Sequence, residues 1–129
     1  RWCQRPSAAA FAPNALIEAD RVELLAGEPV PVMNPSASGK GQKIWRCPTC
    51  WIAVWSNYPA AGHAMRFGRV GTLDQPARLP PDIHIFTASK QPWVQLPPGA
   101  VAVPEYYDAR ERWPAESLRR GAILRGKQG

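Results

Sequence analysis

The sequence lacks any long run of apolar residues. Its longest uninterrupted apolar run, residues 50–55, is far shorter than the roughly 20 residues that a membrane-spanning helix requires. No signal peptide pattern is visible either. We therefore expect no membrane partner. The first residue is arginine and the first methionine is Met33, so we expect the sequence to begin inside a longer reading frame.

Cysteine is scarce, and its odd count of three excludes a simple disulfide framework. Two of the three form the motif Cys47-Pro48-Thr49-Cys50. A Cys-x-x-Cys motif without further pairs is typical of a metal or redox site in a reducing compartment. We therefore expect a cytoplasmic protein.

Proline, by contrast, is abundant. The 129 residues contain 15 prolines, more than double the usual share of about 5%. Because proline breaks helix interiors, the composition predicts a mainly β domain with at most a short C-terminal helix, beginning at Pro114 and ending at Gly121. Short strands are expected at residues 11–17, 22–25, 43–46, 51–55, 65–70 and 83–87.

The net charge of +6 is concentrated at one end. Residues 118–129 hold four basic residues and no acidic one. We therefore divide the chain into a domain at 1–108 and a basic C-terminal tail at 109–129. The tail is the only feature that favours nucleic acid as a partner, and a solvated terminus is the simpler interpretation.

The Cys47–Cys50 motif predicts half of a zinc site. Two cysteines separated by two residues place both sulfurs on one ion, whereas a closed structural site has four ligands. Cys3, His63 and His84 are the candidates for the others. A dithiol redox centre is the alternative, but it requires a helix after the motif, and residues 51–55 are typical of a strand.

Four segments, in order, resemble the family of glutathione-dependent formaldehyde-activating enzymes and centromere protein V. They extend from Cys3 to about residue 96, roughly three-quarters of the chain. Singly each is short, but together and in order they are specific. They are Cys3-Gln4-Arg5 running to Ala10-Phe11, Cys47-Pro48-Thr49-Cys50, Gly71-Thr72-Leu73-Asp74, and His84-Ile85-Phe86 followed by Ser89-Lys90-Gln91-Pro92-Trp93-Val94.

This resemblance implies a β-tent fold of coiled antiparallel sheets around zinc. It implies that Cys47 and Cys50 are ligands of a structural zinc ion, completed by an upstream Cys-x-Cys. Cys3 would be the last ligand of a second zinc site, whose motif Cys-x-Cys-x-x-Cys places a cysteine directly before Arg1. The domain at 1–108 is then partial, with its N-terminal part missing.

The function implied is that of a zinc-dependent carbon–sulfur lyase, which joins glutathione and formaldehyde into S-hydroxymethylglutathione. Arg5 and Lys90 are candidate contacts for the glutathione carboxylates, and His84 is a candidate general acid or base. The alternative is a non-catalytic, zinc-stabilised binding module that recruits a protein partner through the basic tail.

The chain departs from the family pattern at two places. The family usually has Thr-Gly where this chain has Ser7-Ala8, and often has glycine after the second cysteine of the knuckle, where this chain has Trp51. Glycine adopts backbone conformations that other residues rarely adopt. We therefore expect an altered loop after Arg5 and a less regular turn after Cys50.

Overall fold

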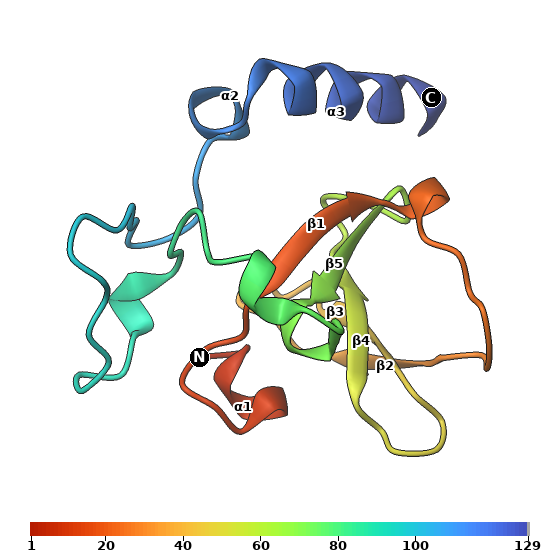
Figure 1. Cartoon of the computed structure of the whole chain (residues 1–129), viewed down its shortest axis with the longest axis horizontal. Coiled ribbons are helices and arrows are strands. Elements are labelled where there is room, and N and C mark those ends of the chain that lie inside the picture. The colour runs from red at the N-terminus through yellow and green to blue at the C-terminus, as the bar shows by residue number, and fades with distance from the viewer. Residues whose placement is uncertain (129) are drawn as a thin grey trace.

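A single five-stranded antiparallel sheet forms the centre of the molecule (Figure 1). The computed structural model describes residues 1–128. The strand order is β1-β5-β4-β3-β2. The strands are β1 (Asn14–Glu18), β2 (Val30–Asn34), β3 (Gln42–Arg46), β4 (Ala53–Asn57) and β5 (Met65–Arg69). The expected mainly β architecture is thus confirmed.

The inner strands are rich in β-branched and aromatic residues, which favour strands. Trp45 of β3 lies directly opposite Trp55 of β4, and their rings stack at 5.7 Å between centroids. The sequence pattern did not indicate β2, because it contains Pro31. A proline lacks an N–H donor, and it is tolerated here because β2 is an edge strand that pairs with β3 alone.

Two expected strands are absent from the described residues. Residues 22–25 follow a 3-10 turn, η1 (Ala19–Arg21), and form no strand. Residues 83–87 contain only an isolated parallel bridge between His84 and Ala102, before η4 (Thr87–Ser89). Long connections with many prolines and few pairing partners thus replace the last part of the expected sheet.

The helical content exceeds the expectation. Four-residue helices α1 (Gln4–Ser7) and α2 (Ala109–Arg112) precede the longer α3 (Ala115–Gln128). The predicted C-terminal helix therefore exists but continues past Gly121. Short 3-10 turns η2 (Val70–Thr72) and η3 (Pro76–Arg78) follow β5. None of the helices within residues 1–128 is long and apolar enough to cross a membrane.

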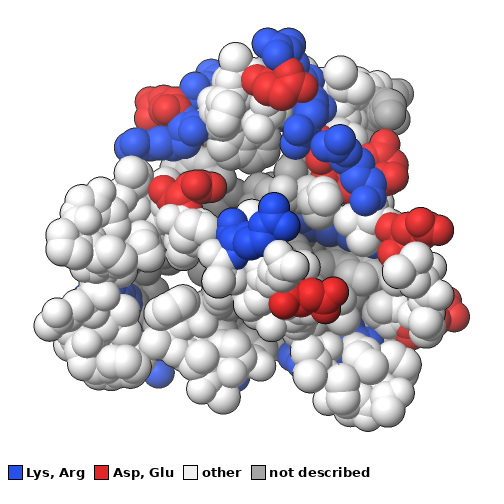
Figure 2. All heavy atoms as spheres, viewed as in Figure 1, with Lys and Arg blue, Asp and Glu red and all other residues white. Residues whose placement is uncertain are grey.

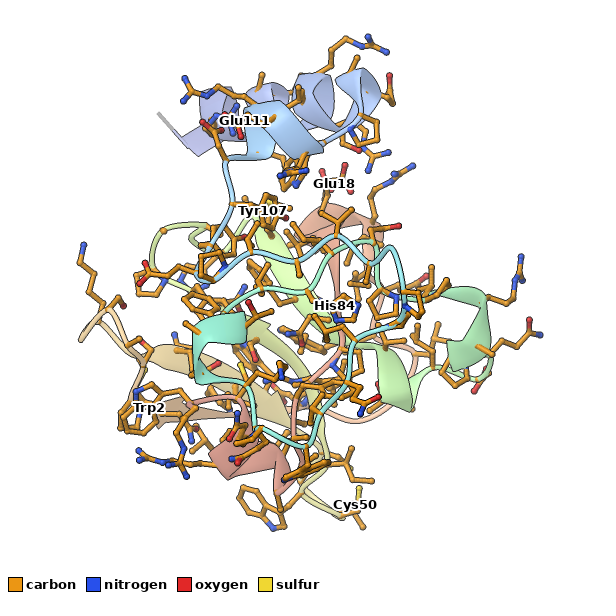
Figure 3. The ribbon with its side chains drawn as sticks, turned by 90° about the vertical axis from the view of Figure 1, so that its left-hand side faces the viewer. Trp2, Glu18, Cys50, His84, Tyr107 and Glu111 are labelled. Carbon is orange, nitrogen blue, oxygen red and sulfur yellow. The ribbon has the colours of Figure 1, made fainter. Side chains whose placement is uncertain are left out.

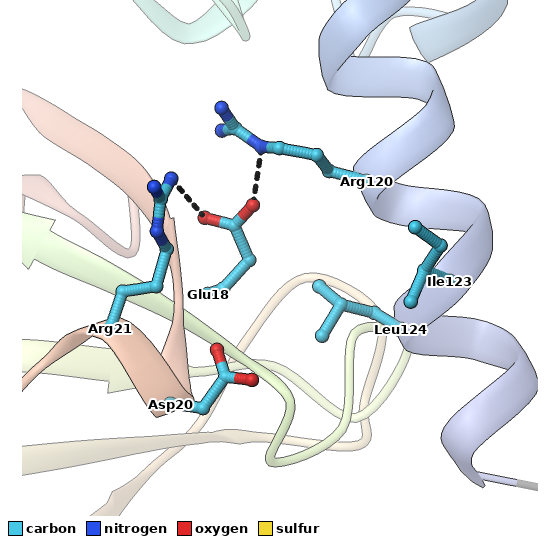
Figure 4. A pocket seen from close by; sticks show the side chains of 6 residues that line it. All are labelled: Glu18, Asp20, Arg21, Arg120, Ile123 and Leu124. Carbon is cyan, nitrogen blue, oxygen red and sulfur yellow. Dashed lines mark ion pairs between the residues drawn. The ribbon is translucent and has the colours of Figure 1, made fainter.

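Helix α3 lies above the sheet and is fixed to it by a buried charge (Figure 1). Glu18, at the end of β1, is only 7% exposed and lies between Arg120 of α3 and Arg21 of η1 (Figure 4). The Arg120 Nε lies 2.5 Å from Glu18 Oε1, and the Arg21 Nη1 lies 3.8 Å from Glu18 Oε2. These ion pairs join the C-terminal helix to the β domain.

Charged side chains gather over α2 and α3 on the face shown in Figure 2, and much of the rest of that face is uncharged. Among the described residues, the buried apolar side chains are Ile44, Trp55 and Val70. Many large apolar side chains are instead exposed, including Leu25 at 89% and Trp93 at 72%. The molecule therefore combines a small core with an apolar surface.

Candidate functional site

The Cys47–Cys50 motif forms a tight turn between β3 and β4, as predicted. The Cys47 N–H donates to the Ile52 carbonyl at 3.0 Å, and the Trp51 N–H donates to the Cys47 carbonyl at 2.9 Å. Arg46 Nη1 donates to the Trp51 carbonyl at 2.8 Å. The turn is therefore closed by backbone bonds on both sides of the two cysteines.

The electrostatic environment of this turn favours a thiolate at Cys47. The backbone N–H groups of Cys50 and then Thr49 donate toward its sulfur, and the Cys50 thiol also donates to it. These hydrogen bonds lower the pKa of the Cys47 thiol below its usual range. Both cysteines are free thiols, and Cys50 is exposed. The two sulfurs thus lie together at the surface.

The other candidate zinc ligands do not join this pair. Among residues 1–128, no three side chains of His, Cys, Asp or Glu form a group suited to a metal ion. His84 and Trp2, the neighbour of Cys3, lie well apart from Cys50 (Figure 3). His63 lines a cavity on the sheet with Trp45 and Trp55. The described residues therefore hold the two candidate ligands Cys47 and Cys50 at one place and the candidate Cys3 at another.

The Cys47–Cys50 turn fits one half of a tetrahedral zinc site. Zinc binds cysteine as the thiolate, and the lowered pKa of Cys47 favours that form. Two sulfurs next to each other in a closed turn match the contribution of one knuckle. Since a structural site has four ligands, this turn would supply two of them.

Cys3 lies in a separate, partly buried environment. It is the residue immediately before α1, and Ser7 Oγ donates to its carbonyl at 2.6 Å. Its side chain lies beside Tyr58, which follows β4. Burial and then the nearby Cys3 thiol together raise the pKa of Tyr58 to about 12. Tyr58 is therefore a neutral phenol at neutral pH.

Aromatic side chains from distant parts of the chain surround Tyr58. Its ring meets Phe67 of β5 edge to face, with 4.8 Å between centroids. Burial and then Tyr107 raise the pKa of Tyr106, and Tyr58 lies near enough to add to this rise. Tyr106 stacks on Tyr107 at 4.7 Å, and Trp113 Nε1 donates to the Tyr107 hydroxyl at 2.9 Å. The Cys3 thiol thus stands beside Tyr58, which belongs to a group of phenols.

Two of the family-like segments meet beside Cys3, although about 85 residues separate them. Gln4 Nε2 donates to the Ser89 carbonyl at 3.0 Å. Gln91 Nε2 donates to Gln4 Oε1 at 2.9 Å. The segment after Cys3 and the segment around Lys90 therefore form one side of this environment.

The three residues predicted for the substrate site differ in how far other parts of the chain already engage them. Lys90 Nζ donates to the Val94 carbonyl at 2.8 Å, so its ammonium group stabilises its own loop. Arg5 is exposed, and its guanidinium lies 4.3 Å from the ring centroid of Trp2. His84 is half-buried, and its backbone N–H and carbonyl bond to Val101 and Val103. Of the three, Arg5 presents its charge to solvent beside Cys3.

The two departures from the family pattern fall on strained backbone. Ala8 has φ of 51° and Trp51 has φ of 60°. Both are in the left-handed region, which glycine adopts without steric cost. The family's glycines at these two places thus correspond to backbone positions that favour glycine.

The fold and this site define a mainly β domain with a cysteine knuckle between two strands and a separate half-buried thiol. A family model described as "Glutathione-dependent formaldehyde-activating enzyme" matches residues 1–89. The chain therefore belongs to the family of glutathione-dependent formaldehyde-activating enzymes, as its motifs predicted. Neither the curated proteins nor the solved structures compared with it gave a match.

Sequence reasoning missed the phenols around Cys3. Tyr58 was not among the predicted site residues, although it directly follows β4. Tyr106 and Tyr107 lie beyond the residues that the family model matches. The adjacent pair of tyrosines was the one available signal. The proximity of Tyr58 to Cys3, and of Tyr106 to Tyr58, depends on tertiary structure and has no signature in residue spacing.

Proposed function

We propose that this protein catalyses the reversible addition of glutathione to formaldehyde, and is thus a carbon–sulfur lyase in the reverse direction. Family membership over residues 1–89 is the observation that carries this proposal. The environment of Cys3 supports it, because a thiol, a neutral phenol and an exposed guanidinium lie in one region.

In this reaction the glutathione thiol loses its proton, its sulfur forms a bond to the formaldehyde carbon as the carbonyl π bond breaks, and the carbonyl oxygen gains one proton. Tyr58 holds its proton at neutral pH and serves as a hydrogen-bond donor beside Cys3. Arg5 attracts a carboxylate of glutathione. Phe67 packs edge to face against Tyr58 and so helps to hold the phenol beside Cys3.

Zinc is the cofactor that we propose for both cysteine sites. Cys47 and Cys50 would hold a structural ion, and Cys3 would be one ligand of a second. A bound zinc ion supplies a Lewis acid that stabilises a thiolate or polarises a carbonyl. The lowered pKa of Cys47 supports the structural assignment. A cytoplasmic location, predicted from the cysteine content, belongs to the same proposal.

Exchange spectroscopy with ¹³C-formaldehyde and glutathione tests this function directly, because it measures both directions of the reaction at equilibrium. We expect zinc-supplemented protein to raise the exchange rate above that of protein-free solution. Cys3→Ser should abolish the increase, whereas Arg78→Gln, an exposed change in η3, should retain it. An exchange rate equal to the protein-free rate, with no heat of glutathione binding in calorimetry, would exclude the proposal.

The alternative of a binding module rests on the basic C-terminal residues. Two of these already have partners within the chain, since Arg120 pairs with Glu18 and Arg119 pairs with Glu116. Less of the positive charge is therefore available to a partner than the sequence suggests. The same Cys3→Ser variant separates the two functions, because a pure binding module has no exchange activity to lose.

A further inference from the structure

The cavity that His63 lines with Trp45 and Trp55 lies on the sheet, away from Cys3. Its volume is about 240 Å³, and its lining combines two tryptophans with both charge signs. The strands contribute Trp45, Trp55, Asn57 and Arg66, and the connections contribute Leu24, Glu28, Pro29 and His63.

Strand alternation separates this cavity from the Cys3 environment. Ser56 lies opposite Phe67, and Trp55 lies opposite Gly68. Because successive side chains point to opposite faces, Trp55 and Arg66 share one face, whereas Phe67 lies on the other. Tyr58 packs against Phe67, so Cys3 belongs to that other face. The cavity is therefore independent of the proposed reaction site.

Arg66 is the unusual residue of the cavity. Its guanidinium lies 4.3 Å from the Trp55 ring centroid, a cation–π contact. Its Nη1 is buried and has no hydrogen-bond partner, and no ion pair of Arg66 occurs within the described part of the chain. A buried guanidinium nitrogen without an acceptor is rare in folded proteins. An incoming oxyanion would supply the missing acceptor.

The tryptophans provide a preformed apolar wall. Trp55 is 6% exposed and stacks with Trp45. Trp45 Nε1 donates to Asn57 Oδ1 at 2.7 Å, and Asn57 Nδ2 donates to the Met65 carbonyl at 2.7 Å. These bonds fix both the indole and the amide before any ligand arrives. Lys43 Nζ, 6.0 Å from the Trp45 ring centroid, adds a second positive charge nearby.

We propose that this cavity binds a small carboxylate attached to an apolar ring, with the carboxylate at Arg66 and the ring against Trp45 and Trp55. Guanidinium–carboxylate hydrogen bonds are among the strongest in proteins. The cavity is smaller than those that hold drug-sized ligands, which begin at roughly 300 Å³. A single ring with a short acid group suits it.

The test uses benzoate as the probe, with benzamide as its uncharged counterpart. The indole N–H signals of Trp45 and Trp55 in ¹H–¹⁵N spectra report on the cavity directly. We expect benzoate to shift both signals, and benzamide to bind at least about tenfold more weakly because it lacks the charge-assisted bond. Equal affinities for the two probes would overturn the proposal, and so would unshifted indole signals. Both outcomes are measured on the unsubstituted protein.

Variants then identify the residue responsible. Arg66→Gln should weaken benzoate binding by about tenfold or more, whereas the exposed Arg78→Gln should leave it unchanged. Glu28→Gln should tighten binding, because it removes a negative charge from the lining. Inorganic phosphate should bind more weakly than benzoate, since it lacks the ring. Phosphate binding as tight as benzoate, or benzoate binding retained in folded Arg66→Gln, would contradict the assignment.

Discussion

Trp51 has a strained backbone conformation within the turn that holds Cys47 and Cys50. The turn requires φ of 60° at this position, and the left-handed region costs a residue other than glycine roughly 1–2 kcal/mol. The side chain is 54% exposed and therefore gains little from burial. The turn is kept because backbone bonds from Cys47 close it on both sides.

We predict that Trp51→Gly stabilises the protein by about 0.5–1 kcal/mol, since the strain removed is partly offset by the greater freedom of glycine in the unfolded chain. Urea unfolding followed by circular dichroism measures the difference. Ile52→Gly is the matched control, because Ile52 is equally exposed but has no positive φ. It should destabilise, and a destabilised Trp51→Gly would show that the indole contributes more than the strain costs.

Residue patterns predicted the cysteine turn well and the rest of the site poorly. Cys47 and Cys50 lie three positions apart between two strands, so their proximity follows from local structure alone. The pairing of Cys3 with Tyr58, and of Gln4 with Ser89, depends on contacts across the whole chain. No spacing rule expresses such contacts, and they became visible only in the folded structure.

At the scale of elements, α3 depends on one charged contact with the sheet. Glu18 is almost fully buried, and Arg120 is its nearest cation. The backbone hydrogen bond to Glu18, followed by Arg120, holds the pKa of this carboxyl below its usual value. A buried carboxylate that loses its cation is costly, because its desolvation is no longer compensated.

We predict that Arg120→Met lowers the free energy of unfolding by about 2 kcal/mol, less than for a fully buried pair because Arg120 is partly exposed. Thermal unfolding of the variant measures the loss. Arg119→Met is the control: it breaks only the exposed pair with Glu116, worth at most about 0.5 kcal/mol. Equal losses in both variants would show that the Glu18 pair does not anchor α3.

Element prediction succeeded where local pattern decides structure. Residues 65–70 alternate, and β5 forms there. Residues 22–25 and 83–87 have strand-like composition, but they have no neighbouring strand to complete a ladder. A strand requires a partner, which composition does not supply. The C-terminal helix continues past Gly121, where a Cβ would be in ordinary van der Waals contact with Trp113 and Arg125.

At the scale of the whole molecule, apolar surface exceeds apolar core. Ile44, Trp55 and Val70 are the buried apolar residues of the described chain, whereas many other large apolar residues are exposed. Hydrophobic burial is the main stabilising contribution to folding. We therefore predict a free energy of unfolding for residues 1–129 without metal below roughly 5 kcal/mol, the lower end for ordinary domains.

Urea unfolding followed by tryptophan fluorescence measures this quantity. Added zinc should raise the unfolding midpoint of the wild-type chain, because a ligand that binds the folded state stabilises it. The double variant Cys47→Ser/Cys50→Ser should show no such increase. A cooperative transition with a free energy of unfolding above roughly 5 kcal/mol, measured in the presence of a strong chelator, would contradict the prediction.

The contact between Gln4 and the Ser89–Gln91 segment has a consequence for the order of folding. Most strand pairs of the sheet are near in sequence, and the pairing of β1 with β5 spans up to 55 residues (Asn14 to Arg69), whereas this contact closes a loop of more than 80 residues by side-chain hydrogen bonds. Closing so long a loop costs entropy before the contact stabilises anything. The segment that follows Cys3 therefore docks on the Ser89–Gln91 segment late during folding, and local opening separates the two early.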